Sequence, residues 1–150
     1  MIFLENFNTR HQTTPFSLIK LSEYKDNFKA CIEKAKTEIN EIIQNSEEPN
    51  FENCIAALDF SGQELDRLSS TFFNLNSAET CDEMQKIAQE VSPWLTEFSN
   101  DITLNEDLFK KIKIVYNKKD TLNLTTEQQT LLDKKYKSFV RNGALLNEEQ

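Results

Sequence analysis

Glycine and histidine are both scarce in this sequence. Its 150 residues include two glycines and one histidine, His11, where average usage would give about ten glycines. The chain therefore lacks the Gly-rich loops that cradle phosphates, and its own residues cannot form an H-E-x-x-H zinc site. A Ser-His or Cys-His dyad would have a single possible base. These absences indicate that the chain by itself is not a complete enzyme.

Cysteine is present, but not in a pattern that binds metal or forms disulfide frameworks. Cys31, Cys54 and Cys81 are odd in number, widely spaced and without a C-x-x-C pair, which favours a reducing compartment. Cys31 and Cys54 fall on or beside apolar stripes, where a free cysteine acts as a small hydrophobic residue. The sequence shows neither a secretory signal nor a membrane-spanning run. We therefore expect a soluble cytoplasmic protein with no membrane partner.

The hydrophobic pattern predicts the fold class. Apolar residues recur at steps of three and four, and residues typical of tight hairpin turns are almost absent. Hydrophobic residues make up 38% of the chain and include 11 phenylalanines, enough to build a core at this length. We predict an all-α bundle of about five antiparallel helices over residues 22–150. An extended arm over residues 1–21 precedes it, and its expected anchors are Phe3, Leu4, Phe7 and Phe16.

The first two helices are predicted from their apolar stripes. The first covers residues 22–45, with Ser22 as its N-cap; its stripe consists of Tyr24, Phe28, Cys31, Ile32, Ala35, Ile39 and Ile42. A second, long helix runs from Phe51 to Leu75, after the stop at Pro49. Gly62 lies on the second stripe, which predicts a helix crossing where a neighbouring backbone comes close. The alternative is a local bend.

Capping patterns place the remaining helices. Thr80 and Glu83 have the T-x-x-E form of a capping box, and Pro93 inside the third helix is expected to kink it near Gln89. Asn105 caps the fourth helix. Its expected inward residues are Leu108, Ile112 and Val115.

The fifth helix and the chain's end follow from the same signals. Thr125 and Gln128 open the fifth helix, and Gly143 ends it. Its expected core residues are Leu132, Tyr136, Phe139 and Val140. Residues 147–150 then resemble a helix start at Asn147 with no helix behind it. The sequence therefore predicts an N-terminal fragment of a longer protein, with self-association through the uncovered apolar surface.

Candidate catalytic groups are few. Asp59, Glu64 and Asp66 are the densest carboxylates, but acidic residues opposite an apolar stripe are ordinarily solvated surface. Cys81 at a helix N-terminus is a candidate reactive thiol without a nearby base. His11 is either a lone metal ligand or, the favoured interpretation, a polar loop residue. We therefore assign no catalytic residue, no metal ligand and no cofactor to this chain, and its substrate-binding residues stay unknown.

Charge is divided unevenly along the chain. Residues 1–105 carry 18 acidic and 8 basic residues, whereas residues 106–141 carry 5 acidic and 9 basic ones. The basic hairpin 106–141 contains Lys110, Lys111, Lys113, Lys118, Lys119, Lys134, Lys135, Lys137 and Arg141. A pI near 4.8 argues against nucleic-acid binding. An intramolecular contact with an acidic partner domain explains the basic hairpin at least as well as nucleic-acid binding does.

Several segments resemble a known family. They are Asn8-Thr9-Arg10-His11, residues 15–20, Phe51-Glu52-Asn53, residues 70–78, residues 100–105 with Leu108-Phe109, and residues 139–144. Together, in this order, they are similar to the N-terminal helical region of the thimet oligopeptidase and peptidyl-dipeptidase family of zinc metallopeptidases. The dipeptidyl carboxypeptidase branch is the best match.

The resemblance implies a cytoplasmic, mostly helical enzyme that cleaves short peptides in a deep channel and, in this branch, releases C-terminal dipeptides. It implies a zinc site, an H-E-x-x-H helix with a further Glu, in a C-terminal catalytic domain that this chain lacks. The N-terminal helices would form part of the channel wall, and the 150-residue chain alone would be inactive. The alternative is an independent helical module that binds an acidic partner through the basic hairpin 106–141.

Overall fold

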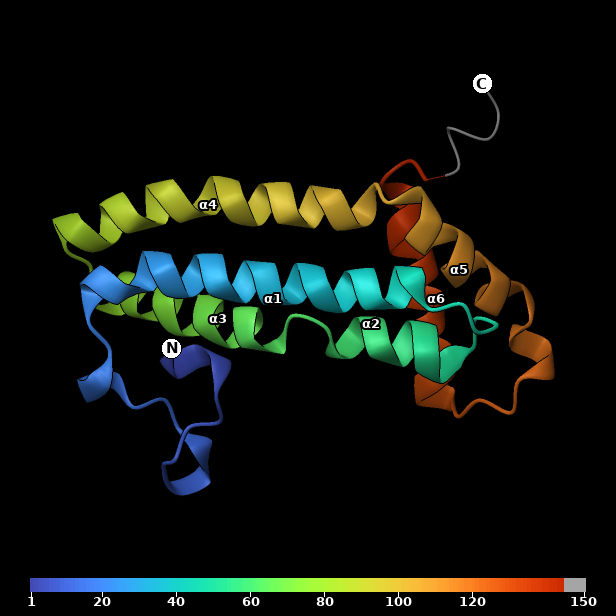
Figure 1. The fold of residues 1–150 in the computed structure, drawn as a ribbon, viewed down its shortest axis with the longest axis horizontal. Coiled ribbons are helices and arrows are strands. Elements are labelled where there is room, and N and C mark those ends of the chain that lie inside the picture. Colours follow the sequence, from blue (N-terminus) through green and yellow to red (C-terminus); the bar gives the residue numbers. More distant parts are fainter. Residues whose placement is uncertain (145–150) are drawn as a thin grey trace. The chain divides into compact units, whose positions relative to one another are not determined.

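Helices account for every regular element in the part of the chain that the structure describes. The computed structural model describes residues 1–144, and no strand occurs among them. Five helices of 12 to 22 residues (α1, α3, α4, α5 and α6) and the short α2 are shown in Figure 1. The predicted all-α fold is confirmed. The predicted helix start at Asn147 lies outside the described residues.

The chain forms two compact units. The first unit comprises Met1–Thr37 and Gly62–Phe98; the second comprises Glu38–Ser61 and the chain from Ser99 onward. Each unit has a hydrophobic core of its own. Because the boundaries fall inside two helices, α1 (Tyr24–Gln44) and α4 (Asp82–Thr103) supply residues to both cores.

The N-terminal segment contains short 3-10 turns rather than α-helix. The turns span Ile2–Leu4, Arg10–Gln12, Phe16–Leu18 and Leu21–Glu23. Phe3 and Phe7 are buried, as predicted, and Leu4 is partly buried, but Phe16 is 55% exposed and does not anchor the segment. Arg67 of α3 holds the segment, because its Nη2 donates to the carbonyl oxygens of Phe3 and Glu5, at 2.6 and 2.8 Å.

Helix α1 buries the face that its periodicity predicts. All seven residues of the predicted stripe are buried along Tyr24–Gln44. In the first unit, Phe28 makes an edge-to-face contact with Phe72 of α3, with ring centroids 5.6 Å apart. Tyr24 lies against the same ring, at 4.9 Å. The N-terminal part of α1 therefore packs on α3 (Gln63–Ala78) through aromatic side chains.

The predicted long second helix is broken, and the prediction was wrong at Gly62. A π-helical turn, Phe51–Ala56, leads into α2 (Ala57–Phe60), and α3 begins after the break. Gly62 has φ 75° and ψ 14°, a left-handed conformation. A Cβ added there would lie 3.6 Å from the Ala35 Cβ, which is an ordinary van der Waals distance. The backbone conformation, not a tight helix crossing, requires the glycine.

Helix α4 differs from the prediction at its start. The helix spans Asp82–Thr103 and continues through Pro93. The Cys81 carbonyl accepts the first helical hydrogen bond, from the Gln85 amide at 3.0 Å. The Thr80 hydroxyl instead donates to Oδ1 of Asn76, at 2.9 Å. The predicted capping box at Thr80 was therefore wrong, because Cys81 precedes the first turn and the Thr80 hydroxyl oxygen accepts from the side chain of Gln85, at 3.3 Å.

Helices α5 (Glu106–Asn117) and α6 (Thr126–Arg141) follow the capping predictions. The Asn105 side chain accepts from the Leu108 amide at 2.8 Å, and Thr125 and Gln128 form a reciprocal capping box. Helix α6 ends in a Schellman motif at Gly143, whose φ is 92°. The predicted core residues that are fully buried here are Leu108, Ile112, Val115, Leu132 and Phe139.

Candidate functional site

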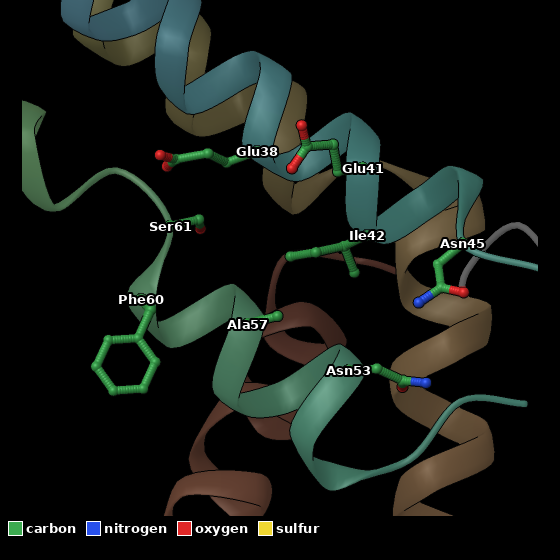
Figure 2. Close-up of a pocket in the computed structure, with 8 residues that line it drawn as sticks. All are labelled: Glu38, Glu41, Ile42, Asn45, Asn53, Ala57, Phe60 and Ser61. Carbon is green, nitrogen blue, oxygen red and sulfur yellow. The ribbon is translucent and has the colours of Figure 1, made fainter. Parts of the chain in front are cut away.

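A hollow of about 380 Å³ in the second unit is the candidate site. It lies between the last turns of α1 and the segment from the π-helical turn to the end of α2 (Figure 2). The residues that line it are Glu38, Glu41, Ile42 and Asn45 from α1, and Asn53, Ala57, Phe60 and Ser61 from the second segment.

Small side chains create the hollow. Ala57 and Ser61 stand where larger residues would fill the space beside Ile42. The Ser61 hydroxyl donates to the Leu58 carbonyl oxygen at 2.8 Å, so it serves the end of α2. Phe60 lies at the rim with its side chain 67% exposed, and its ring points away from Ile42 (Figure 2). The floor of the hollow is therefore apolar and shallow.

The two amide side chains that line the hollow form hydrogen bonds to backbone groups. Oδ1 of Asn45 accepts from the Glu47 amide at 2.9 Å. Asn53 forms a capping box with Asn50, and its Nδ2 donates to the Glu48 carbonyl oxygen at 3.1 Å. Both amide side chains therefore stabilise the turn between α1 and α2. The charged side chains that line the hollow are those of Glu38 and Glu41.

The two carboxylates of the hollow are Glu38 and Glu41, three residues apart on α1. Figure 2 shows the Glu38 side chain extending toward the loop of backbone next to Ser61. Within residues 1–144, Glu41 forms no ion pair. Glu41 also lies in the last turn of α1, which contains no basic residue. The negative end of the helix dipole therefore adds to its charge.

The carboxylates singled out in the sequence are partnered or exposed on a helix surface. Asp59 pairs with Lys135, at 2.9 Å, and Asp66 is exposed. Glu64 pairs with Lys34, at 2.6 Å. Partial burial raises the pKa of Glu64, but the hydrogen bond from Lys34 and neighbouring positive charge outweigh it and leave the pKa below its ordinary value. A general acid would need the opposite shift.

The thiols and the histidine do not form a reactive centre. Burial raises the pKa of Cys31 and of Cys54 to about 11, so both stay protonated at neutral pH. Cys81 is exposed beside the start of α4. His11 is exposed in the turn Arg10–Gln12, with φ 59°. Across residues 1–144, no group of three or more His, Cys, Asp and Glu side chains is placed to hold a metal ion.

The basic hairpin 106–141 is largely matched by acidic partners within its own unit. Lys118 pairs with Glu48, and Lys135 pairs with Asp59 at 2.9 Å. Pairs within the hairpin are Lys110 with Asp107, Lys119 with Asp133, and Lys137 with Asp133. Lys111 donates to the Asn45 carbonyl oxygen at 2.5 Å. Much of the positive charge that the sequence placed here is therefore used in intramolecular contacts.

The hollow was not predicted from the sequence. The residues that line it, among them Glu38, Glu41, Asn53 and Ser61, were not predicted as site residues. Two signals were present: acidic residues near the C-terminal end of a helix, where the dipole disfavours them, and small residues at 56–57 and 61–62 within an apolar stretch.

None of the helices in residues 1–144 is both long and apolar enough to cross a membrane.

Comparisons with known proteins show similarity to peptidases. No family model matches it. The dipeptidyl carboxypeptidase of Salmonella typhimurium is 35% identical over 139 residues, which are 93% of this chain and 20% of that protein. The dipeptidyl carboxypeptidase of Escherichia coli is 35% identical over 131 residues, 87% of this chain and 19% of that protein. Oligopeptidase A of Haemophilus influenzae is 24% identical over 91% of this chain.

Over most of its length the chain is therefore similar to the N-terminal part of these peptidases, as the resemblance in the sequence indicated. It spans about a fifth of the length of these relatives and matches their N-terminal part.

Proposed function

We propose that this chain is the N-terminal helical part of a longer zinc-dependent oligopeptidase, a peptidyl-dipeptidase that releases C-terminal dipeptides from short peptides. The observation that supports the proposal is the match to two dipeptidyl carboxypeptidases over 93% and 87% of this chain but only a fifth of their length. Its helices would form part of the wall of the substrate channel and restrict access to unfolded peptides. The three free cysteines favour the reducing cytoplasm as its location.

The residues of this chain do not fit a catalytic zinc site. Such a site needs three protein ligands around one open position. His11 is the one histidine of the chain, and it is exposed in an irregular turn. We therefore assign zinc, the catalytic residues and the hydrolytic step to the C-terminal domain of the longer protein, and we expect the 150-residue chain to be inactive.

The test compares the 150-residue chain with the longer gene product on the same internally quenched peptide. We expect cleavage by the longer protein alone, its loss after chelation, its return with zinc, and release of dipeptides from the C-terminal end, followed by mass spectrometry. Cleavage by the 150-residue chain would contradict the assignment. So would a longer protein whose activity survives removal of the metal.

The role in the channel wall has its own test. The longer protein should cleave a short peptide but not the same sequence placed in a surface loop of a folded protein. Equal cleavage of both substrates would contradict that role. The independent binding module loses support because Lys118 and Lys135 of the basic hairpin 106–141 are paired with Glu48 and Asp59.

A further inference from the structure

Residues 1–8 form a strap that two phenylalanine side chains anchor in the first unit. Phe3 is fully buried and Phe7 is 5% exposed, and they make an edge-to-face contact with ring centroids 5.7 Å apart. The Phe3 ring also lies near that of Tyr24 on α1, with centroids 6.3 Å apart. The other side chains of the strap are partly buried or exposed. The fully buried contacts of the strap are therefore few and aromatic.

Arg67 of α3 is the polar fastening of the strap. Its Nη2 donates to the carbonyl oxygens of Phe3 and Glu5, at 2.6 and 2.8 Å. Its guanidinium also lies over the Phe7 ring, 4.4 Å from the centroid. Hydrogen bonds from a charged donor are stronger than neutral ones, and the cation–π contact adds to them. One side chain of α3 therefore contacts three residues of the strap.

The same arginine is incompletely satisfied while the strap is in place. Its Nε is buried and has no hydrogen-bond partner among residues 1–144. A buried donor without a partner costs free energy comparable to the gain from a hydrogen bond. Release of the strap would let water reach this atom, so part of the free energy lost with the two carbonyl bonds would be recovered.

The turn that follows the strap is strained. His11 and Gln12 have φ values of 59° and 53°, so two consecutive exposed residues are left-handed. The Thr13 amide closes this turn on the Arg10 carbonyl oxygen, at 3.4 Å. Turns with two left-handed central residues favour Asn-Gly, because other side chains pay a steric cost there. A turn released together with the strap can leave this conformation, so opening also relieves backbone strain.

We propose that the strap opens as a unit about the turn at residues 10–13, with Arg67 as its latch, while α1 and α3 stay helical. Burial of Phe3 and Phe7 favours the closed state, and the unpaired Nε and the strained turn oppose it. The open state exposes the part of Tyr24 that Phe3 contacts when the strap is closed. The first core thereby gains an aromatic face without losing its helices.

Thiol labelling of the 150-residue chain measures how often the strap opens. Phe7→Cys in a Cys81→Ser background puts a thiol on the strap and removes the exposed native one. Iodoacetamide labelling, followed by mass spectrometry, gives the opening of the strap, and hydrogen exchange of the α1 amides gives the opening of the helix. We expect the introduced thiol to be exposed at least about tenfold more often than the slowest α1 amides. Equal opening of the two would overturn the proposal, because the strap would then open only when the unit unfolds.

Two further changes should move the labelling rate in opposite directions. Arg67→Met removes the latch and should speed labelling about tenfold. His11→Asn together with Gln12→Gly supplies the residues that the turn favours and should slow labelling about three- to tenfold. Lys86→Met is the control: it removes a positive charge from an exposed residue of α4 in the same unit and should leave the rate unchanged.

Circular dichroism of each variant shows whether it has kept its helices. If Phe7→Cys does not fold, Leu4→Cys places the thiol at a partly buried position of the same strap. Labelling that Arg67→Met leaves unchanged, or that Lys86→Met speeds equally, would overturn the proposal. So would a variant with Asn-Gly in the turn that opens as often as the parent chain.

Discussion

Replacing Gly62 by alanine should destabilise the chain by about 1 kcal/mol. Gly62 has φ 75°, and a left-handed backbone costs a residue with a Cβ about 1–2 kcal/mol. Alanine also lowers the conformational entropy of the unfolded chain, which stabilises the folded state by about 0.4–1 kcal/mol and offsets part of this cost. The added Cβ would lie 3.6 Å from that of Ala35, so steric overlap adds little. The conformational cost therefore dominates.

Gly62→Asn separates the two explanations for this glycine. Asparagine tolerates the left-handed region better than alanine, so it should cost about 0.5 kcal/mol or less. A tight helix crossing would give the reverse order, because asparagine is larger. Urea denaturation followed by circular dichroism measures both changes. If Gly62→Asn is less stable than Gly62→Ala, the argument from backbone conformation is wrong.

Two further predictions concern ionisable groups. The pKa of Glu64 is lower in the folded chain than its ordinary 4.5, so its stabilising effect is present above about pH 4.5 and is lost as the pH falls through the folded-state value. Lys34→Met should therefore flatten the fall in unfolding free energy below pH 4.5, measured by urea titration, and an unchanged slope would contradict the pairing. At pH 8, Ellman's reagent should modify Cys81 alone in the native chain and all three thiols in denaturant, because Cys31 and Cys54 are buried with a pKa of about 11. Rapid modification of two or three native thiols would show that those cores open.

Local and periodic signals predicted most of the helices correctly. The stripe on α1 and the caps at Asn105 and Thr125 agree with the structure because they depend on residues close together in the sequence. Gly62 was misinterpreted for a physical reason. Leu58 and Leu65 keep the same period whether a helix continues between them or stops and restarts.

The other differences depend on contacts that the periodic and capping patterns do not contain. Thr80 satisfies its hydroxyl with Asn76, which a pattern within four residues of a helix start does not reveal. Phe16 is exposed although it is as hydrophobic as Phe3. The hollow exists because Ile42 of α1 faces Ala57 of α2, a pairing that periodicity alone cannot specify. Only the acidic and small residues were visible beforehand.

The division of the chain into two units bears on how it can fold and be dissected. Each unit is assembled from two separate stretches, and the chain passes from one unit to the other inside α1, after Ser61 and inside α4. No single cut therefore releases either unit intact, and neither core can be completed until a later stretch has returned to it. During synthesis, the first core must wait for residues up to 98, while residues 38–61 have already emerged without their partners from α5 and α6.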